Sequence, residues 1–254
     1  MGKVHTGASR VLVSILAVVT MSGTSTAAAS AVEPDRSTTL PAPILAPVSG
    51  ETVGVAHPVS IRFPSPVVDR AAAESTISIA SSTNAPGHFS WVDDSTLGWH
   101  PDRFWPAHTR ITVRAAGARS EFQVGDALVA VANTTTHQFI VSINDQVVRT
   151  MPASMGKPGY ETPHGTFPVL EKFREMVMDS STYGVPVDSA EGYRLHVEYA
   201  TRITWGGIFV HGAPWSVDSQ GYENVSHGCI NLSTENARWF YDNAKIGDPV
   251  IVTG

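Results

Sequence analysis

The sequence predicts a mostly β protein with two β-rich domains and one clear helix near the C-terminal end. Three observations predict this fold class. Short runs that alternate apolar and polar residues recur between residues 44 and 124, further β-type runs follow Gly125-Asp126, and a helical apolar period follows Leu232. The chain has 254 residues and a hydrophobic content of 42%, which is enough for two buried cores.

Residues 1–31 have the pattern of a secretory signal. Lys3 and Arg10 precede an apolar run over residues 11–21, and small residues follow at 27–31. The apolar run is shorter than the roughly 20 residues that a membrane-spanning helix needs. We therefore expect an exported protein in the periplasm or cell wall, with tethering through an uncleaved signal as the alternative.

Residues 32–43 predict a linker, because Pro34, Pro41 and Pro43 are spaced by Ser and Thr without a hydrophobic period. The next region, residues 44–124, is typical of a small β-sandwich with an immunoglobulin-like outline. One helical turn is expected at Ala71–Glu74. The strand-like runs are Val59–Phe63, Ile77–Ile79, Phe89–Val92, Leu97–Trp99 and Thr109–Arg114. No cluster of catalytic residue types occurs in this region, so we interpret it as a spacer or positioning domain.

Residues 125–252 predict the second, β-rich domain. Asn144-Asp145 is a hairpin signal between two strand-like runs. The helix is expected to begin after an N-cap at Ser233 and to end before Gly247, with apolar residues at helical spacing. These are Ala237, Phe240, Tyr241 and Ala244, and Pro249–Val252 then predicts a closing strand.

The charge balance disfavours nucleic acid as a partner. The net charge of the chain is −6, and removal of Lys3 and Arg10 with the signal makes it −8. Such a protein has no bulk attraction for nucleic acid or anionic lipid and must recognise an anionic polymer through local contacts.

Cys229 is the only cysteine, and it lies in the stretch Ser226–Asn231 two residues after His227. A second histidine, His211, follows a strand-like run. A thiol with a pKa near 8.5 needs a base or a positive environment to attack a carbonyl group at neutral pH. We therefore interpret Cys229 as the nucleophile of an acyl-transfer enzyme.

The surroundings of Cys229 suggest two further contributions. Gly228 lets a substrate approach closely, and its amide and that of Cys229 are candidates for an oxyanion hole. The nearby N-terminus of the predicted helix would help to hold a thiolate. Two other interpretations are a buried structural cysteine and a zinc site formed by His211, His227 and Cys229. The zinc site lacks a fourth ligand and any ligand-spaced cluster, so no metal or other cofactor is predicted.

With these residues in place, the chain resembles the L,D-transpeptidases with a YkuD-type catalytic domain, most closely the mycobacterial type with one immunoglobulin-like domain before it. The resemblance covers residues 44–252 and depends on His211-Gly212 and Ser226–Cys229. It implies a cysteine acyltransferase that acts on peptidoglycan stem peptides. Cys229 would displace D-alanine from a donor tetrapeptide, and a diaminopimelate amine of an acceptor stem would resolve the thioester to form a diaminopimelate-diaminopimelate cross-link.

The resemblance also assigns roles to the residues of the motif. It implies that His211 is the general base, oriented by the backbone carbonyl of Gly212, and that His227 has a supporting role. Gly228 belongs to the signature beside the nucleophile, and Ser226 is expected among the substrate-binding residues.

The other implied substrate-binding residues lie outside the motif. Residues 176–193 resemble a flap over the catalytic pocket, from which Tyr193 would contact substrate and contribute a hydroxyl group to the oxyanion site. Tyr183 and Met178 would line the cavity. Gly206, Gly207 and Asn231 match further substrate-binding positions.

The resemblance implies acylation of Cys229 by carbapenems, whose strained lactam presents an electrophilic carbonyl group to the same sulfur. Two alternative functions remain at this point. An L,D-carboxypeptidase would resolve the thioester with water, and a non-catalytic wall-binding module would keep the fold without the reaction.

Overall fold

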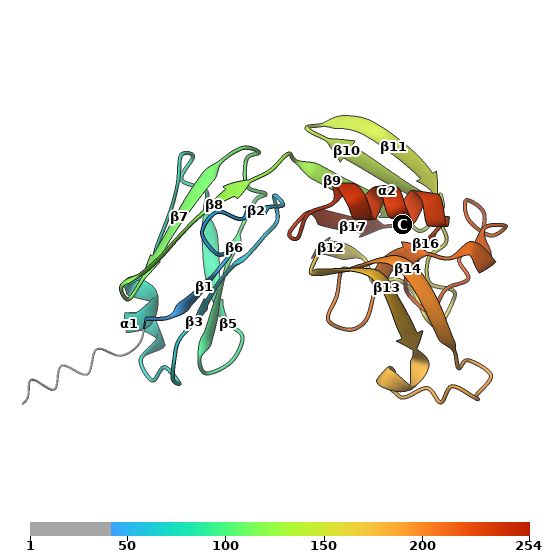
Figure 1. Cartoon of the computed structure of the whole chain (residues 1–254), viewed down its shortest axis with the longest axis horizontal. Coiled ribbons are helices and arrows are strands. Elements are labelled where there is room, and N and C mark those ends of the chain that lie inside the picture. Colours follow the sequence, from blue (N-terminus) through green and yellow to red (C-terminus); the bar gives the residue numbers. More distant parts are fainter. Residues whose placement is uncertain (1–41) are drawn as a thin grey trace, which may run out of the picture. The chain divides into compact units, whose positions relative to one another are not determined.

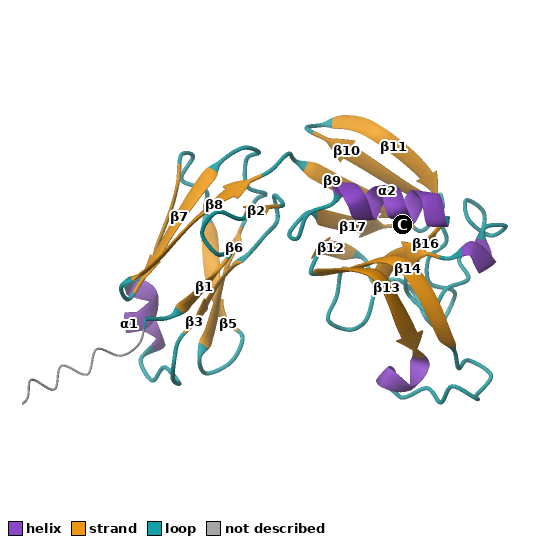
Figure 2. Ribbon diagram, viewed as in Figure 1, coloured by secondary structure: helices purple, strands orange, loops and turns teal. Residues whose placement is uncertain are grey.

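The structure is a computed structural model that describes residues 42–254. It confirms a mostly β protein, in which strands alternate with short loops and α-helix is confined to two segments of the described chain (Figure 2). The predicted signal, residues 1–31, lies outside the described residues, as does nearly all of the predicted linker. Within residues 42–254, no helix combines the length and apolar character that a membrane span requires.

The first domain is an immunoglobulin-like sandwich of two four-stranded sheets with the strand orders β1-β3-β6-β5 and β2-β8-β7-β4 (Figure 1). The expected helical turn is the short helix α1. The elements are β1 (Ile44–Ala46), β2 (Thr52–Val53), β3 (Val59–Arg62), α1 (Arg70–Ser75), β4 (Ser78–Ser81), β5 (Gly87–Trp91), β6 (Thr96–Pro101), β7 (Arg110–Ala115) and β8 (Ala118–Val124).

The core of this domain forms where the inward residues of the two sheets meet. Trp99 and Trp105 are buried, and their rings stack with centroids 5.0 Å apart. Trp91 packs against the same cluster at its edge. Such burial of large aromatic surface stabilises a sandwich of this size, so the tryptophans of this domain are core residues.

The second domain contains two further sheets, with the orders β11-β10-β9-β17-β12 and β13-β14-β15-β16. The first of these sheets carries most of the core, and the second carries the site. The elements are β9 (Leu128–Asn133), β10 (Gln138–Ile143), β11 (Gln146–Pro152), β12 (Gly165–Pro168), β13 (Glu171–Asp179), η1 (Ser180–Tyr183), β14 (Arg194–Arg202), β15 (Phe209–Gly212), η2 (Pro214–Ser216), β16 (Ile230–Leu232), α2 (Thr234–Asn243) and β17 (Pro249–Thr253).

Helix α2 connects the two sheets of the second domain. Its N-cap is Ser233, as predicted, since the Ser233 side chain accepts a hydrogen bond from the Asn236 amide. Phe240 is fully buried and packs edge-to-face on Phe139 of β10, with ring centroids 5.0 Å apart. The helix also contacts β14 and β15, so it holds the sheet that carries the site against the main core.

Two hairpins show where the sequence pattern succeeded and where it was incomplete. Asn144 and Asp145 both have positive φ, 48° and 64°, and form the predicted turn between β10 and β11. The strands β13 and β14 were not predicted as strands. Each strand has nine residues, eight of which pair with the other strand, and η1 and the loop that follows connect the two. This tip and the adjoining ends of the strands, residues 176–193, form the predicted flap.

Candidate active site

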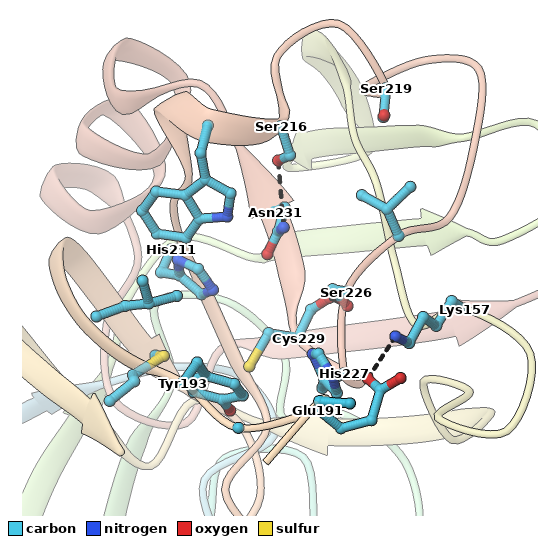
Figure 3. A pocket seen from close by; sticks show the side chains of 16 residues that line it. Lys157, Glu191, Tyr193, His211, Ser216, Ser219, Ser226, His227, Cys229 and Asn231 are labelled. Carbon is cyan, nitrogen blue, oxygen red and sulfur yellow. Dashed lines mark hydrogen bonds and ion pairs between the residues drawn. The ribbon is translucent and has the colours of Figure 1, made fainter. Parts of the chain in front are cut away.

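The candidate base and nucleophile lie on two neighbouring strands of one sheet. β15 and β16 pair in parallel, with Val210 opposite Ile230 and His211 opposite Asn231. Cys229 immediately precedes β16. The backbone hydrogen bonds of the sheet therefore fix the relative positions of His211 and Cys229, and both side chains line one cavity of about 420 Å³ (Figure 3).

His211 is held as a neutral base. Only 3% of the residue is exposed, and its Nδ1 lies 2.9 Å from the Gly212 carbonyl oxygen. A carbonyl oxygen only accepts, so Nδ1–H is the donor and Nε2 keeps its lone pair. Burial lowers the pKa of His211 to about 4, against the smaller raising effect of the Gly212 bond. The orienting bond expected from the sequence is thus present, and because it uses the backbone carbonyl of Gly212 it needs no side chain at that position.

The Cys229 thiol is also neutral in the resting site. Burial raises the pKa of Cys229 to about 11, although a backbone hydrogen bond from Phe209 and the charge of Arg202 act in the opposite direction. Sγ lies 3.7 Å from the Gly207 carbonyl oxygen, the acceptor for the thiol proton. The helix N-terminus that was expected to help hold a thiolate is not among the groups that lower this pKa, and the strand β16 separates Cys229 from α2.

Ser226 closes the turn that presents the sulfur. Its Oγ donates to the Cys229 carbonyl oxygen at 2.6 Å and accepts from the Gly228 amide at 3.1 Å. Thr162 Oγ1 donates to the Gly228 carbonyl oxygen at 2.8 Å. Gly228 has a φ of +113°, and a Cβ there would lie 2.9 Å from Ile208 Cδ1. The positive φ therefore favours glycine at this position, and a side chain there would also displace the end of the Ile208 side chain.

The same bonds change the expected oxyanion hole. The Gly228 amide donates to Ser226, so it is not free to bind a developing oxyanion. The Cys229 amide donates no hydrogen bond to any other described residue. Burial and the neighbouring Tyr183 side chain raise the pKa of Tyr193, which keeps its phenol protonated and able to donate. The Cys229 amide is thus the free donor beside the sulfur, and the Tyr193 hydroxyl group, which lies next to Tyr183, is the second candidate donor.

His227 forms a side wall of the cavity. Its Nε2 lies 2.7 Å from Glu191 Oε2, and its ring packs between those of Tyr160 and Tyr193, with centroid distances of 4.7 and 5.3 Å. Lys157 Nζ lies 2.6 Å from the same carboxylate oxygen (Figure 3). The ring of His227 is therefore fixed between neighbouring rings. It connects the turn Ser226–Cys229, called the catalytic turn below, to the flap.

Asn231 contributes a polar group without a partner. The residue is 4% exposed, and its Nδ2 donates to Ser216 Oγ at 3.2 Å. Its Oδ1 is buried and has no hydrogen-bond partner among the described residues. A buried acceptor of this kind costs free energy unless a ligand or water satisfies it, and Asn231 lines the cavity that contains Cys229.

The flap separates this cavity from a second one of about 340 Å³. Met178 and Tyr193 line both cavities. Tyr183, which is 48% exposed, lines only the second cavity. Gly206 and Gly207 also lie there. The structure therefore divides the predicted substrate-binding residues between two neighbouring cavities.

The sequence analysis missed several residues that line the cavities. Trp215 lines the first cavity, and its ring centroid is 6.0 Å from that of His211. Its position soon after the His211 motif was an available signal. Arg202 and Trp205 shortly precede the predicted Gly206-Gly207, which was a similar signal, whereas Lys157 and Glu191 are far from the motif and had none. Within residues 42–254, no three His, Cys, Asp or Glu side chains form a group suited to holding a metal ion.

Family models match both domains. A model of the L,D-transpeptidase catalytic domain, YkuD, matches residues 127–252, and a model of a bacterial Ig domain matches residues 16–118. L,D-transpeptidase 1 of Mycobacterium tuberculosis is 51% identical over 210 residues, which cover 83% of this chain and 84% of the relative. Probable L,D-transpeptidase 3 of the same organism is 46% identical over 228 residues, with a coverage of 81% and 84%.

Solved structures agree with these relatives. The structure of the L,D-transpeptidase LdtMt1 in complex with imipenem has a TM-score of 0.81 and 50% identity, and the match covers 84% of this chain and 99% of that one. L,D-transpeptidase 3 from Mycobacterium tuberculosis in complex with a faropenem-derived adduct has a TM-score of 0.78 and 45% identity, with a coverage of 84% and 98%.

Proposed function

The chain belongs to the L,D-transpeptidase family with a YkuD-type catalytic domain, and we propose that it forms diaminopimelate-diaminopimelate cross-links between peptidoglycan stem peptides. The donor is a tetrapeptide stem that loses its terminal D-alanine. The acceptor is the side-chain amine of another stem. The covalent intermediate is a thioester on Cys229.

The first half-reaction needs a proton acceptor for a neutral thiol. His211 Nε2 takes the proton from Sγ as the sulfur attacks the carbonyl carbon of diaminopimelate. The Cys229 amide and the Tyr193 hydroxyl group stabilise the oxyanion. The C–N bond then breaks, and the imidazolium of His211 returns the proton to the departing amine of D-alanine.

The second half-reaction uses the same base. The neutral acceptor amine attacks the thioester carbon, and His211 accepts one of its protons. The C–S bond breaks, and the proton passes to the sulfur, so an amide and the free thiol are formed. No cofactor takes part in this scheme.

One observation carries this proposal: the bond between His211 Nδ1 and the Gly212 carbonyl oxygen, at 2.9 Å. It leaves Nε2 as a proton acceptor in the cavity that contains the only thiol of the chain. The unpaired Asn231 Oδ1 supports a peptide ligand, since a backbone N–H of the stem satisfies it.

A dimerisation assay tests the reaction. Disaccharide tetrapeptide incubated with the protein should give cross-linked dimer and free D-alanine, and Cys229→Ala should give neither. Exclusive formation of tripeptide would favour the L,D-carboxypeptidase. No product from the intact protein, together with wall binding that survives Cys229→Ala, would favour the non-catalytic wall-binding module.

We also propose that carbapenems acylate Cys229. Relatives of this chain have been solved in complex with imipenem, a carbapenem, and with a faropenem-derived adduct. The strained lactam carbonyl reacts with the sulfur as the donor carbonyl does, and opening of the ring leaves a thioester. Intact-protein mass spectrometry should show one adduct on the native protein and none on Cys229→Ala, whereas equal labelling of both proteins would contradict the assignment.

The proposed site of action is the cell wall, which the protein reaches through the signal at residues 1–31. Its substrate would be found only there. N-terminal sequencing of the protein recovered from cell fractions tests this point. A start near residue 30 or 32 supports cleavage, an intact N-terminus in the membrane fraction supports tethering, and an intact cytoplasmic protein would contradict export.

A further inference from the structure

Lys157 and Glu191 form an ion pair in the wall of the catalytic cavity. Nζ and Oε2 are 2.6 Å apart, and 31% of the lysine side chain and 43% of the glutamate side chain are exposed. Glu191 belongs to the flap loop that precedes β14. Lys157 lies between β11 and β12, and its backbone amide donates to the Ser226 carbonyl oxygen at 3.0 Å. The pair therefore connects the flap to the segment beside the catalytic turn.

This pair supplies the formal charges of the cavity. Among the described residues that line the cavity, Lys157 is the only Lys or Arg and Glu191 is the only Asp or Glu. The lining also includes two histidines, His211 and His227. Both retain hydrogen-bonding capacity. Among residues 42–254, Lys157 Nζ has one hydrogen-bond acceptor for its three protons, and Glu191 Oε1 has no donor. A ligand in the cavity thus meets one cation and one anion side by side.

The acceptor has matching charges. The side chain of a stem diaminopimelate ends in an amino-acid group, a carbon that carries an ammonium and a carboxylate. We propose that Lys157 and Glu191 are the binding site for this amino-acid end, with Glu191 holding the ammonium and Lys157 the carboxylate. This inference rests on the proposed function and assigns the acceptor side of the same cavity.

The surroundings of Glu191 favour this role. Hydrogen bonds from Lys157 and then His227 lower the pKa of Glu191, so the group is a carboxylate at neutral pH. The ring of His227 is itself packed between Tyr160 and Tyr193, which fixes the Oε2 side of the carboxylate. Lys157 and His227 both bond to Oε2, so Oε1 is the carboxylate oxygen left free to accept a charge-assisted hydrogen bond from the ligand's ammonium.

The site acts before the chemical step and favours amine over water. An ammonium cannot attack the thioester, so it binds at Glu191 first, loses one proton to solvent and then attacks as the neutral amine, whose next proton His211 accepts. Water gains nothing from either charge. The pair therefore determines how the thioester is divided between cross-linking and hydrolysis, and which amine is accepted.

The experiment uses the purified protein with a tetrapeptide donor and two tripeptide acceptors. One acceptor carries diaminopimelate, and the other carries lysine, which has the amine without the neighbouring carboxylate. The readout is the ratio of dimer to hydrolysed donor. Glu191→Gln should lower this ratio about tenfold with both acceptors, because a charge-assisted bond is lost. Lys157→Met should remove a preference of about tenfold for the diaminopimelate acceptor and leave the lysine acceptor little changed.

Two controls separate binding from folding and from flap closure. Carbapenem acylation of Cys229 needs no amine, so both variants should be acylated within about twofold of the native rate. Glu175→Gln is the matched variant. Glu175 pairs with Arg174 and His196 on the same hairpin, and it does not line the cavity. It should leave the product ratio unchanged.

Two results would overturn the inference. If acylation and dimer formation fall by the same factor with an unchanged product ratio, the pair only holds the flap. If the ratio and the preference between acceptors are both unchanged, the pair does not touch the acceptor. Failure of the proposed function looks different, since the native protein would then give tripeptide and no dimer with either acceptor, and the inference would fail with it.

Discussion

The catalytic turn and the flap face the same cavity but are built differently. The turn lies beside β15 and β16, whose residues are all buried, and backbone and Ser226 hydrogen bonds fix its shape. The flap presents accessible side chains, such as the exposed Tyr183 and the half-buried Glu191, at the end of a long hairpin. The difference indicates that proton transfer depends on backbone held in a core, whereas choice of substrate depends on side chains that remain accessible.

Among the substitutions considered, loss of the base His211 should reduce the acylation rate of Cys229 the most. His211→Gln should slow carbapenem acylation of Cys229 by about 10³-fold, because an amide does not accept the thiol proton. Time-resolved intact mass spectrometry measures the rate. His196→Gln, an exposed histidine of the flap hairpin, is the control and should react at the native rate. A loss smaller than about tenfold in His211→Gln would show that another group takes the proton.

Tyr193 is the flap residue that most directly tests whether the chemistry is confined to the turn and the choice of substrate to the flap. If its hydroxyl group stabilises the oxyanion, Tyr193→Phe should lower the acylation rate by about 10²-fold with little change in thermal stability. Tyr222→Phe is a control, since Tyr222 is largely exposed and does not line the cavity. An unchanged rate in Tyr193→Phe would restrict the chemistry to the turn.

A pair of glycines compares backbone constraint in the two regions. Gly228→Ala adds a contact with Ile208 to an unfavourable φ, so we expect a loss of about 2 kcal/mol in unfolding free energy and about tenfold slower acylation. Gly184 in the flap also has a positive φ, +91°, but a Cβ there meets nothing within 4 Å. Gly184→Ala should lose about 1 kcal/mol and react at nearly the native rate. Equal effects on acylation would contradict the comparison.

The pH dependence of acylation should be small. His211 becomes protonated only as the pH falls toward its lowered pKa of about 4, and Cys229 ionises only as the pH approaches about 11. The reactive neutral pair therefore dominates between these values, and the rate should change by less than about twofold from pH 6 to 8.5. A tenfold rise per pH unit would instead indicate that a free thiolate is the reacting species.

The sequence predicted the turn well because its residues are close together in the chain. Ser226, Gly228 and Cys229 belong to one contiguous motif, and His211 lies near the end of a recognisable strand. The helix α2 and the Asn144-Asp145 hairpin were likewise encoded by local signals, an N-cap in one case and residues that tolerate positive φ in the other.

The flap was harder to predict, for a physical reason. β13 has charged and apolar residues without a clean alternation, because part of the hairpin extends away from the core. The contact between Lys157 and Glu191 spans 34 positions and exists only after the flap has folded over the turn. The predicted donors of the oxyanion hole were partly wrong, because no sequence pattern shows that the Gly228 amide donates to Ser226 Oγ.

The place of β17 in its sheet affects when the enzyme can first work. This strand, Pro249–Thr253, lies between β9 and β12, although it comes last in the sequence among the described strands. Until residues 249–253 are in place, β9 lacks its parallel neighbour and the core lacks Val250 and Val252. A chain in which this strand has not yet folded therefore has no closed scaffold for the thiol and the imidazole, and the C-terminal strand must dock before the first turnover.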